Sequence, residues 1–145
     1  MAFRRKSKDA KVRLLSGVAL FRPCTKGELA RIASLVDEIE APQGKTLTRE
    51  GEPGWEFFVI AEGTATARCR GRKVAEIGPG SFFGEMSLLD EGPRSATVTA
   101  DTDMHLLVLS SRSFSSLIDE VPAVARRILR GLAERLRAAE QEPTH

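Results

Sequence analysis

Residues 78–98 read GPGSFFGEMSLLDEGPRSATV, and this stretch interrupts a series of short β-type runs. Gly-Pro turns frame it at residues 78–80 and 92–93. Between them, residues 85–89 are long enough for about one helical turn, which is too short to be stable by itself. The first backbone N–H groups of such a turn have no partner within the helix, so they are available to an anion.

Charged and small residues accompany this turn. Gly84 carries no Cβ and lets a ligand approach the backbone, while Arg94 supplies a planar fork of donors. Ser95 and Ala96 add further N–H groups, and the Glu85 carboxylate can accept from a sugar hydroxyl. Anion donors beside one hydroxyl acceptor favour a sugar phosphate as ligand. A simpler interpretation also fits, in which Glu85 and Arg94 form a surface ion pair and the turns only connect strands.

Short β-type runs lie on both sides of this stretch, from about residue 39 to residue 109, and glycine and proline separate them. The predicted strands cover residues 45–48, 57–61, 64–70, 73–77, 96–100 and 104–109. Many short strands at near-even spacing indicate a sandwich or a barrel.

Helical periodicity appears at both ends of the chain. Residues 12–20 predict a short helix, and the capping box of Thr25 and Glu28 begins an amphipathic one. Beyond residue 110, one helix is expected to end near Val121, because Pro122 disfavours helix in the residue before it and suits the start of the next. The last helix has a narrow apolar stripe made of Ala125, Ile128, Leu132, Leu136 and Ala139. This stripe either packs back on the strands or forms a dimer seam.

Composition bounds the class of protein. A chain of 145 residues with 41% hydrophobic residues can bury one modest core, which excludes a large multidomain enzyme. Residues 1–13 hold six basic residues and one acidic residue, whereas the remainder has a net charge of −3. We therefore expect a basic flexible arm over residues 1–13 and one folded domain over residues 14–145. The arm has a second interpretation, as an electrostatic tether to nucleic acid or anionic lipid.

The sequence also bears on membrane insertion, disulfides and metal sites. No run approaches the ~18 apolar residues of a membrane span, and no apolar signal-peptide stretch follows the basic residues, so the protein is expected to be cytoplasmic. Cys24 and Cys69 are too few and too isolated for a disulfide framework, and are expected to be reduced thiols. With only His105 and His145, the chain predicts no multi-histidine metal site, and no metal or cofactor is expected.

The order of residues in the opening stretch resembles the phosphate-binding cassette of the cyclic nucleotide-binding domain family. This family includes regulatory subunits of cyclic-nucleotide-dependent kinases, cyclic-nucleotide-gated channels and bacterial catabolite activator proteins. Its pattern is Phe-Gly-Glu, a short apolar helix, and then Arg, a small residue and Ala. Residues 83–85, 86–89 and 94–96 match these three parts, and the likeness extends over about residues 14–140.

The resemblance implies both a fold and a site. The implied fold is mainly β, an eight-stranded antiparallel β-roll with N-terminal helices and C-terminal lid helices. In the implied site, Glu85 accepts from the ribose 2′-hydroxyl and Arg94 binds the cyclic phosphate together with backbone N–H groups. The residues expected to bind the nucleotide are Phe83, Gly84, Glu85, Met86, Ser87, Arg94, Ser95 and Ala96.

We interpret the chain as a stand-alone cyclic nucleotide sensor, with cAMP favoured over cGMP, that signals through cassette closure and movement of the C-terminal helix. No catalytic activity is expected, because nothing resembles a nucleophile with a positioned base. The expected partners are the nucleotide, an unidentified effector protein and a second copy bound through the C-terminal helix. Direct DNA binding is not expected, since the 36 residues from Ser110 to His145 are too few for a lid and a helix-turn-helix. The alternative function is a β-roll interaction scaffold that has lost nucleotide binding.

Overall fold

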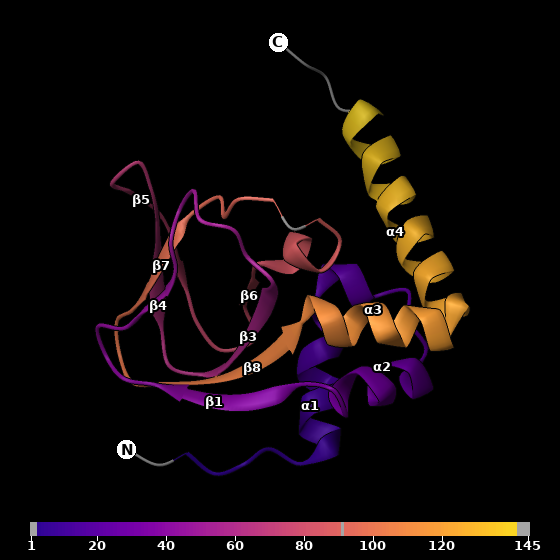
Figure 1. The fold of residues 1–145 in the computed structure, drawn as a ribbon, viewed down its shortest axis with the longest axis horizontal. Coiled ribbons are helices and arrows are strands. Elements are labelled where there is room, and N and C mark those ends of the chain that lie inside the picture. The colour runs from indigo at the N-terminus through magenta and orange to yellow at the C-terminus, as the bar shows by residue number, and fades with distance from the viewer. Residues whose placement is uncertain (1–2, 91, 142–145) are drawn as a thin grey trace.

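The computed structural model describes residues 3–90 and 92–141. Within these residues, eight strands form two antiparallel sheets of four strands each, in the orders β1-β8-β3-β6 and β2-β7-β4-β5. The helices gather on one side of the β-roll, and α4 extends away from it (Figure 1). The eight-stranded antiparallel β-roll with flanking helices, which the resemblance implied, is confirmed.

The strands are β1 (Asp37–Ala41), β2 (Thr46–Thr48), β3 (Glu56–Glu62), β4 (Ala65–Cys69), β5 (Arg72–Ile77), β6 (Phe82–Phe83), β7 (Thr97–Ala100) and β8 (Met104–Ser110). The helices are α1 (Lys8–Ser16), η1 (Ala19–Phe21), α2 (Lys26–Ala33), η2 (Glu85–Leu88), α3 (Ser111–Glu120) and α4 (Pro122–Gln141), of which η1 and η2 are 3₁₀-helices. None of the helices among the described residues combines the length and apolar character that a bilayer span requires.

The six predicted strands are all present, and two further strands, β1 and β6, were not predicted. β1 has the sequence DEIEA and is mostly exposed, so it lacks an apolar signal. It lies at the edge of its sheet, where its backbone pairs with β8. β6 has only two residues and is defined by its pairing with β3. Both strands therefore depend on a neighbour distant in sequence.

The helix predictions hold best where a cap or a proline fixes the boundary. Thr25 and Glu28 form the predicted capping box at the start of α2, and α3 ends at Glu120, two residues before Pro122. The single helix predicted over residues 12–20 is wrong, because α1 begins earlier and ends at Ser16, before η1. Ser7 causes the earlier start, since its side chain accepts a hydrogen bond from the Ala10 N–H at 3.1 Å.

Two hydrophobic clusters share strand β8. Leu107 and Leu109 belong to the cluster between the sheet and the helices, whereas Leu106 and Val108 belong to the cluster inside the roll. This division follows from the alternation of side chains along a strand. β8 is therefore buried on both faces and joins the helical layer to the roll.

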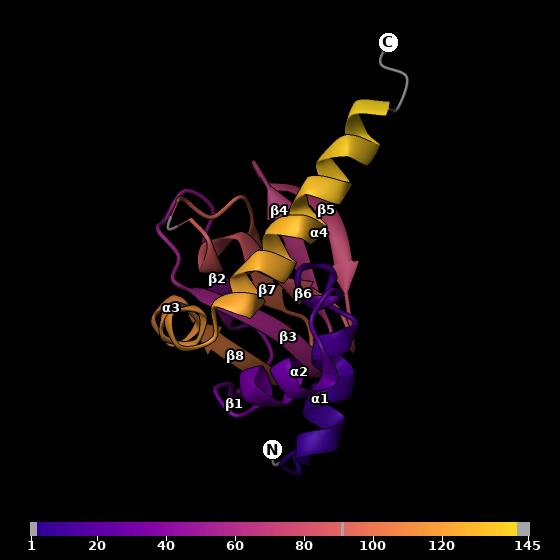
Figure 2. The same cartoon turned by 90° about the vertical axis from the view of Figure 1, so that its right-hand side faces the viewer.

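The apolar stripe of α4 is divided between two environments. Ile128 of the stripe is buried in the cluster that joins the helices to the sheet, and so is Val124, which lies outside the stripe. Leu136 is 62% exposed, and the neighbouring Leu129 is 64% exposed. Figure 2 shows the second half of α4 extending beyond the other helices. The first half thus packs on the body as one interpretation expected, while the dimer seam stays a prediction.

An ion pair fastens α4 to α2. Arg127 Nε lies 2.8 Å from Glu28 Oε1, and the Glu28 side chain is only 10% exposed. Burial alone would raise the pKa of Glu28, but the Thr25 N–H and the Arg127 guanidinium hold this pKa below its ordinary range. The pKa of Glu28 is lower in the folded state than in the unfolded state. The pair therefore stabilises the fold fully above the unfolded-state pKa, and this contribution is lost as pH falls through the folded-state pKa.

We expect Glu28→Gln to lower the free energy of unfolding by about 1 kcal/mol at pH 7. Glutamine at this position still serves the capping box, so the change isolates the ion pair. Urea unfolding at pH 7 and pH 3.5 measures the effect, and the difference between variant and wild type should shrink at the lower pH. The control is Glu120→Gln, which removes the exposed pair with Arg31 and should cost less than about 0.5 kcal/mol. Equal losses in both variants, or a loss independent of pH, would contradict the role of Glu28.

Candidate functional site

A cavity of about 420 Å³ opens beside η2, within the size range of small-molecule sites. All eight residues predicted to bind the nucleotide lie along it: Phe83, Gly84, Glu85, Met86, Ser87, Arg94, Ser95 and Ala96. The lining also includes residues outside the prediction: Thr48, Phe82, Asp90, Gly92, Pro93 and Val98. The structure thus brings the two halves of the predicted cassette to one concave surface.

Gly84 shapes the entry to the short helix. It follows β6 directly and has a φ of +78°, in the left-handed region that favours glycine. The expected turn of helix after it is present as η2, in 3₁₀ rather than α form. A Cβ on Gly84 would lie 2.6 Å from Arg94 Nη1 and 2.9 Å from the Glu56 carbonyl oxygen. Gly84 is therefore required both by the backbone turn and by the approach of the arginine.

The Arg94 side chain is held from several sides. Its Nη1 donates to Ser87 Oγ at 2.8 Å, and its guanidinium carbon lies 5.9 Å from the centroid of the Phe58 ring. A Cβ on Gly54 would come within 2.1 Å of Arg94 Nε, so the guanidinium passes directly over this glycine. The contacts preorganise the guanidinium at the cavity.

The backbone of Arg94 is fixed as well. Its N–H donates to the Glu52 carbonyl at 2.8 Å, and its carbonyl accepts from the Gly51 N–H at 2.9 Å. Burial lowers the pKa of Arg94, and the nearby Glu56 carboxylate opposes this change. A guanidinium nevertheless stays charged in proteins, so the cavity contains a partly desolvated fixed cation.

Glu85 contributes a carboxylate with spare acceptor capacity. Its Oε2 atom is buried and has no hydrogen-bond partner among the described residues. Burial raises the pKa of Glu85, and the charge of Arg135 on α4 and the Leu20 N–H counteract this effect. Across residues 3–90 and 92–141, no ion pair joins Glu85 to Arg94, so the surface ion pair considered from the sequence is wrong.

The remaining predicted residues form the floor and the rim. Phe83 stacks on Phe58 with ring centroids 4.8 Å apart, beneath the guanidinium. Ser87 is buried and is the arginine's hydrogen-bond partner, whereas Met86 is 55% exposed at the rim. Ser95 is exposed, and Ala96 lies next to it at the cavity wall.

Besides the further lining residues, the sequence did not reveal Gly54 and Phe58, which contact the Arg94 side chain. Both lie about 40 positions before Arg94, and glycine in a turn or phenylalanine in a strand has an ordinary structural explanation. The bridge between Pro53 and Pro93 brings the two turns together. Only the pairing of distant segments reveals these contacts.

The two cysteines have no role in this cavity. Burial raises the pKa of Cys24 to about 11, which makes its thiol unreactive at neutral pH. The Cys69 thiol donates to Glu50 Oε2 at 3.3 Å, and neither cysteine forms a disulfide within the described residues.

Comparison with known families identifies this arrangement. The sequence model described as "Cyclic nucleotide-binding domain" matches residues 38–121, which is more than half of the chain. The chain belongs to the cyclic nucleotide-binding domain family. The match includes the whole described cavity lining and every strand except the first residue of β1, so the resemblance noted in the sequence is confirmed.

Individual relatives agree with the family assignment. The chain is 36% identical over 126 residues to a cyclic nucleotide-gated potassium channel of Mesorhizobium japonicum, covering 87% of this chain and 35% of that protein. It is 36% identical over 133 residues to the cyclic AMP receptor protein of Thermus thermophilus, covering 88% of this chain and 62% of that protein. The chain thus spans less than two thirds of these relatives.

A solved structure shows the same likeness in three dimensions. The N-terminal domain of a transcriptional regulator from Streptomyces coelicolor A3(2) superposes with a TM-score of 0.84 at 32% identity. The superposition covers 91% of this chain and 98% of that one. The similarity therefore extends well beyond the cassette.

Proposed function

We propose that this chain binds a cyclic nucleotide, with cAMP favoured over cGMP, and acts as a sensor without catalytic activity. One observation carries the proposal: Arg94, with a preorganised guanidinium, and Glu85, with an unpartnered carboxylate oxygen, line the same cavity. An anionic ring joined to a hydroxyl-bearing sugar matches this pair of groups. The membership of the chain in the cyclic nucleotide-binding domain family supports the same ligand class.

In the proposed complex, Arg94 and the backbone N–H groups of Gly84, Ser95 and Ala96 hold the cyclic phosphate. Glu85 accepts from the ribose 2′-hydroxyl. Each charge-assisted hydrogen bond contributes roughly 1.5–3 kcal/mol. Three or four of them supply much of the ~8 kcal/mol that a micromolar ligand requires. No metal or organic cofactor is needed for this recognition.

The proposed signal passes through η2 and α4. The charge of Arg135 on α4 lowers the pKa of Glu85, so a ligand that engages this carboxylate would also change its electrostatic interaction with the helix. Ligand binding is expected to close the cassette and draw α4 toward the roll, and this requires different affinities in the two arrangements. The exposed Leu129 and Leu136 would then be presented to, or withdrawn from, an effector protein or a second copy.

Isothermal titration of the full chain with cAMP and cGMP tests the proposal. We expect saturable heat with cAMP in the micromolar range and weaker binding of cGMP. No heat with either nucleotide at high micromolar concentration would contradict binding and favour the interaction-scaffold function. Appearance of the 5′-monophosphate during incubation would contradict the absence of catalysis.

The role of Glu85 is tested with a ligand that lacks the hydroxyl. We expect Glu85→Ala to weaken cAMP binding by about 10-fold or more, the equivalent of one charge-assisted hydrogen bond, and to leave binding of 2′-deoxy-cAMP nearly unchanged. Titration of both nucleotides into wild type and variant gives four affinities. From these, the loss caused by Glu85→Ala is compared between cAMP and 2′-deoxy-cAMP. Equal losses for the two nucleotides would show that Glu85 does not accept from this hydroxyl.

A further inference from the structure

The outer face of the first sheet has a cluster of acidic residues that are not part of the cavity lining. Glu38 and Glu40 are on β1 and Glu62 is on β3, and we call these three residues the acidic face. His105 on β8 lies between the two strands, because its register partners are Glu40 on one side and Glu62 on the other. The sheet therefore places one histidine among three carboxylates.

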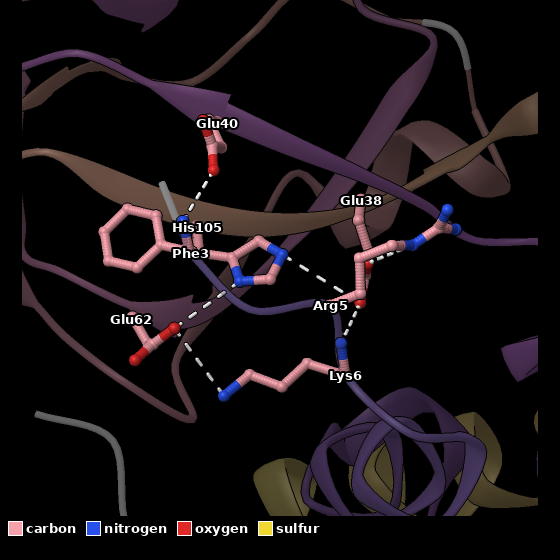
Figure 3. Close-up of polar contacts among 7 residues, drawn as sticks. All are labelled: Phe3, Arg5, Lys6, Glu38, Glu40, Glu62 and His105. Carbon is pink, nitrogen blue, oxygen red and sulfur yellow. Dashed lines mark hydrogen bonds and ion pairs between the residues drawn. The ribbon is translucent and has the colours of Figure 1, made fainter. Parts of the chain in front are cut away.

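The basic N-terminal segment lies across this face (Figure 3). The Phe3 N–H donates to Glu40 Oε1 at 2.8 Å, and the Lys6 N–H donates to Glu38 Oε1 at 2.6 Å. Arg5 Nε binds the other oxygen of Glu38 at 3.1 Å. Two of these contacts use backbone donors and one uses a side chain. The backbone contacts fix the path of residues 3–6, and the side-chain contact pairs a basic group with a carboxylate.

The alternation of β8 explains why a docking position exists here. Leu107 and Leu109 on the outer face are covered by the helical layer, and His105 is the next residue on that face. The N-terminal segment covers it in place of a helix. The Phe3 ring stacks on the imidazole with centroids 5.6 Å apart and an interplanar angle of 17°, and His105 is only 2% exposed.

The buried imidazole faces the same carboxylates as the segment does. His105 Nδ1 has no hydrogen-bond partner among the described residues and lies 3.5 Å from Glu62 Oε2. Its Nε2 lies 3.9 Å from Glu38 Oε1. Lys6 Nζ also reaches Glu62 Oε2, at 3.7 Å. Glu38 and Glu62 are thus shared between the histidine and the cations of the segment.

The charges around Glu38 reflect this arrangement. Burial alone would raise the pKa of its carboxyl, but the Lys6 N–H, the Lys11 charge and Arg5 hold this pKa below the usual range. The cations that act on the carboxylates beside the imidazole are therefore Arg5 and Lys6 from the segment and Lys11 from α1.

We propose that the acidic face is a docking site for the chain's own basic N-terminal segment, and that protonation of His105 releases this segment. Histidine is the side chain that changes charge between about pH 5 and pH 8. A charged imidazole would pair with Glu38 and Glu62 itself and would repel the Arg5 and Lys6 cations that share these two carboxylates.

The sign of the pH dependence follows from proton linkage. The undocked state leaves the imidazole in water without the segment's cations, so it binds a proton more readily than the docked state does. Acidification therefore favours undocking. This inference concerns a surface apart from the nucleotide cavity and does not depend on the proposed function.

Nuclear magnetic resonance of the full chain tests the proposal. Heteronuclear NOE values for the amides of Phe3 and Lys6 report their order, with α1 as the internal reference. At pH 8 we expect the two amides to be as ordered as α1, and at pH 5 we expect their order to be lost while α1 is unchanged. Order at both pH values, or disorder at both, would overturn the proposal.

Two substitutions separate the docking contacts from the pH response. The double variant Arg5→Ala with Lys6→Ala should release the segment already at pH 8, whereas Arg4→Ala should not, because Arg4 forms none of the ion pairs found among residues 3–90 and 92–141. His105→Gln should keep the segment docked at pH 5. Docking that survives the double variant would overturn the assigned contacts, and release of the His105→Gln segment with the wild-type midpoint would overturn the role of His105.

Discussion

Replacing Arg94 by alanine is expected to weaken cAMP binding by about 100-fold or more, or about 3 kcal/mol, while the chain stays folded. The change removes the cation and the fork of donors from the cavity, and no other arginine that the structure describes lines it. Stability should change little, because Arg94 makes one side-chain hydrogen bond, to Ser87, in a half-buried position. Isothermal titration measures the affinity, and circular dichroism confirms the fold.

The control for this variant is Arg72→Ala, which removes an arginine from an exposed position of β5 outside the cavity lining. It should bind cAMP as the wild type does. Wild-type affinity for cAMP in Arg94→Ala would refute the phosphate site. Equal losses of affinity in both arginine variants would show that Arg94 acts only through general charge attraction and not through direct contact with the phosphate.

A companion change tests the position of the guanidinium rather than its presence. Gly54 has a φ outside the left-handed region, so alanine meets no backbone strain there. The added Cβ would lie 2.1 Å from Arg94 Nε and must displace the side chain. Gly54→Ala is therefore expected to weaken cAMP binding in the same direction as Arg94→Ala, with a wild-type melting temperature. Unchanged affinity would show that the approach of Arg94 over Gly54 is not needed for binding.

Replacing Phe21 by alanine is expected to lower the free energy of unfolding by about 3–5 kcal/mol. The Phe21 ring is fully buried. Its centroid lies 5.8 Å from that of Phe57 on β3, in an edge-on arrangement, and 6.1 Å from that of Phe114 on α3. Its removal leaves a cavity where η1, the sheet and α3 meet, and the residues around it belong to three separate elements that cannot all move inward.

Urea unfolding at constant pH measures this loss. Leu129→Ala is the matched control, because Leu129 is 64% exposed and its truncation should cost less than about 0.5 kcal/mol. A loss below about 1 kcal/mol in Phe21→Ala would contradict the role of this ring in joining the helices to the roll.

Local signals in the sequence determined the cassette and several helix boundaries of this protein. The cassette was predictable because Gly84, Glu85 and Arg94 lie close to two turns and in the order that the family pattern has, whereas their spacing alone also allowed a surface ion pair. The start of α2 and the junction before Pro122 were predictable because caps and prolines act on their own neighbours. These effects require no knowledge of the fold.

The tertiary structure decided the contacts between segments that are distant along the chain. It placed Gly54 under the Arg94 guanidinium, paired the acidic strand β1 with β8, and set His105 between Glu38 and Glu62. None of these residues has an unusual local pattern. Their roles arise because sheet pairing and burial remove water from groups that are separated in sequence, and such pairings depend on the packing of the whole chain.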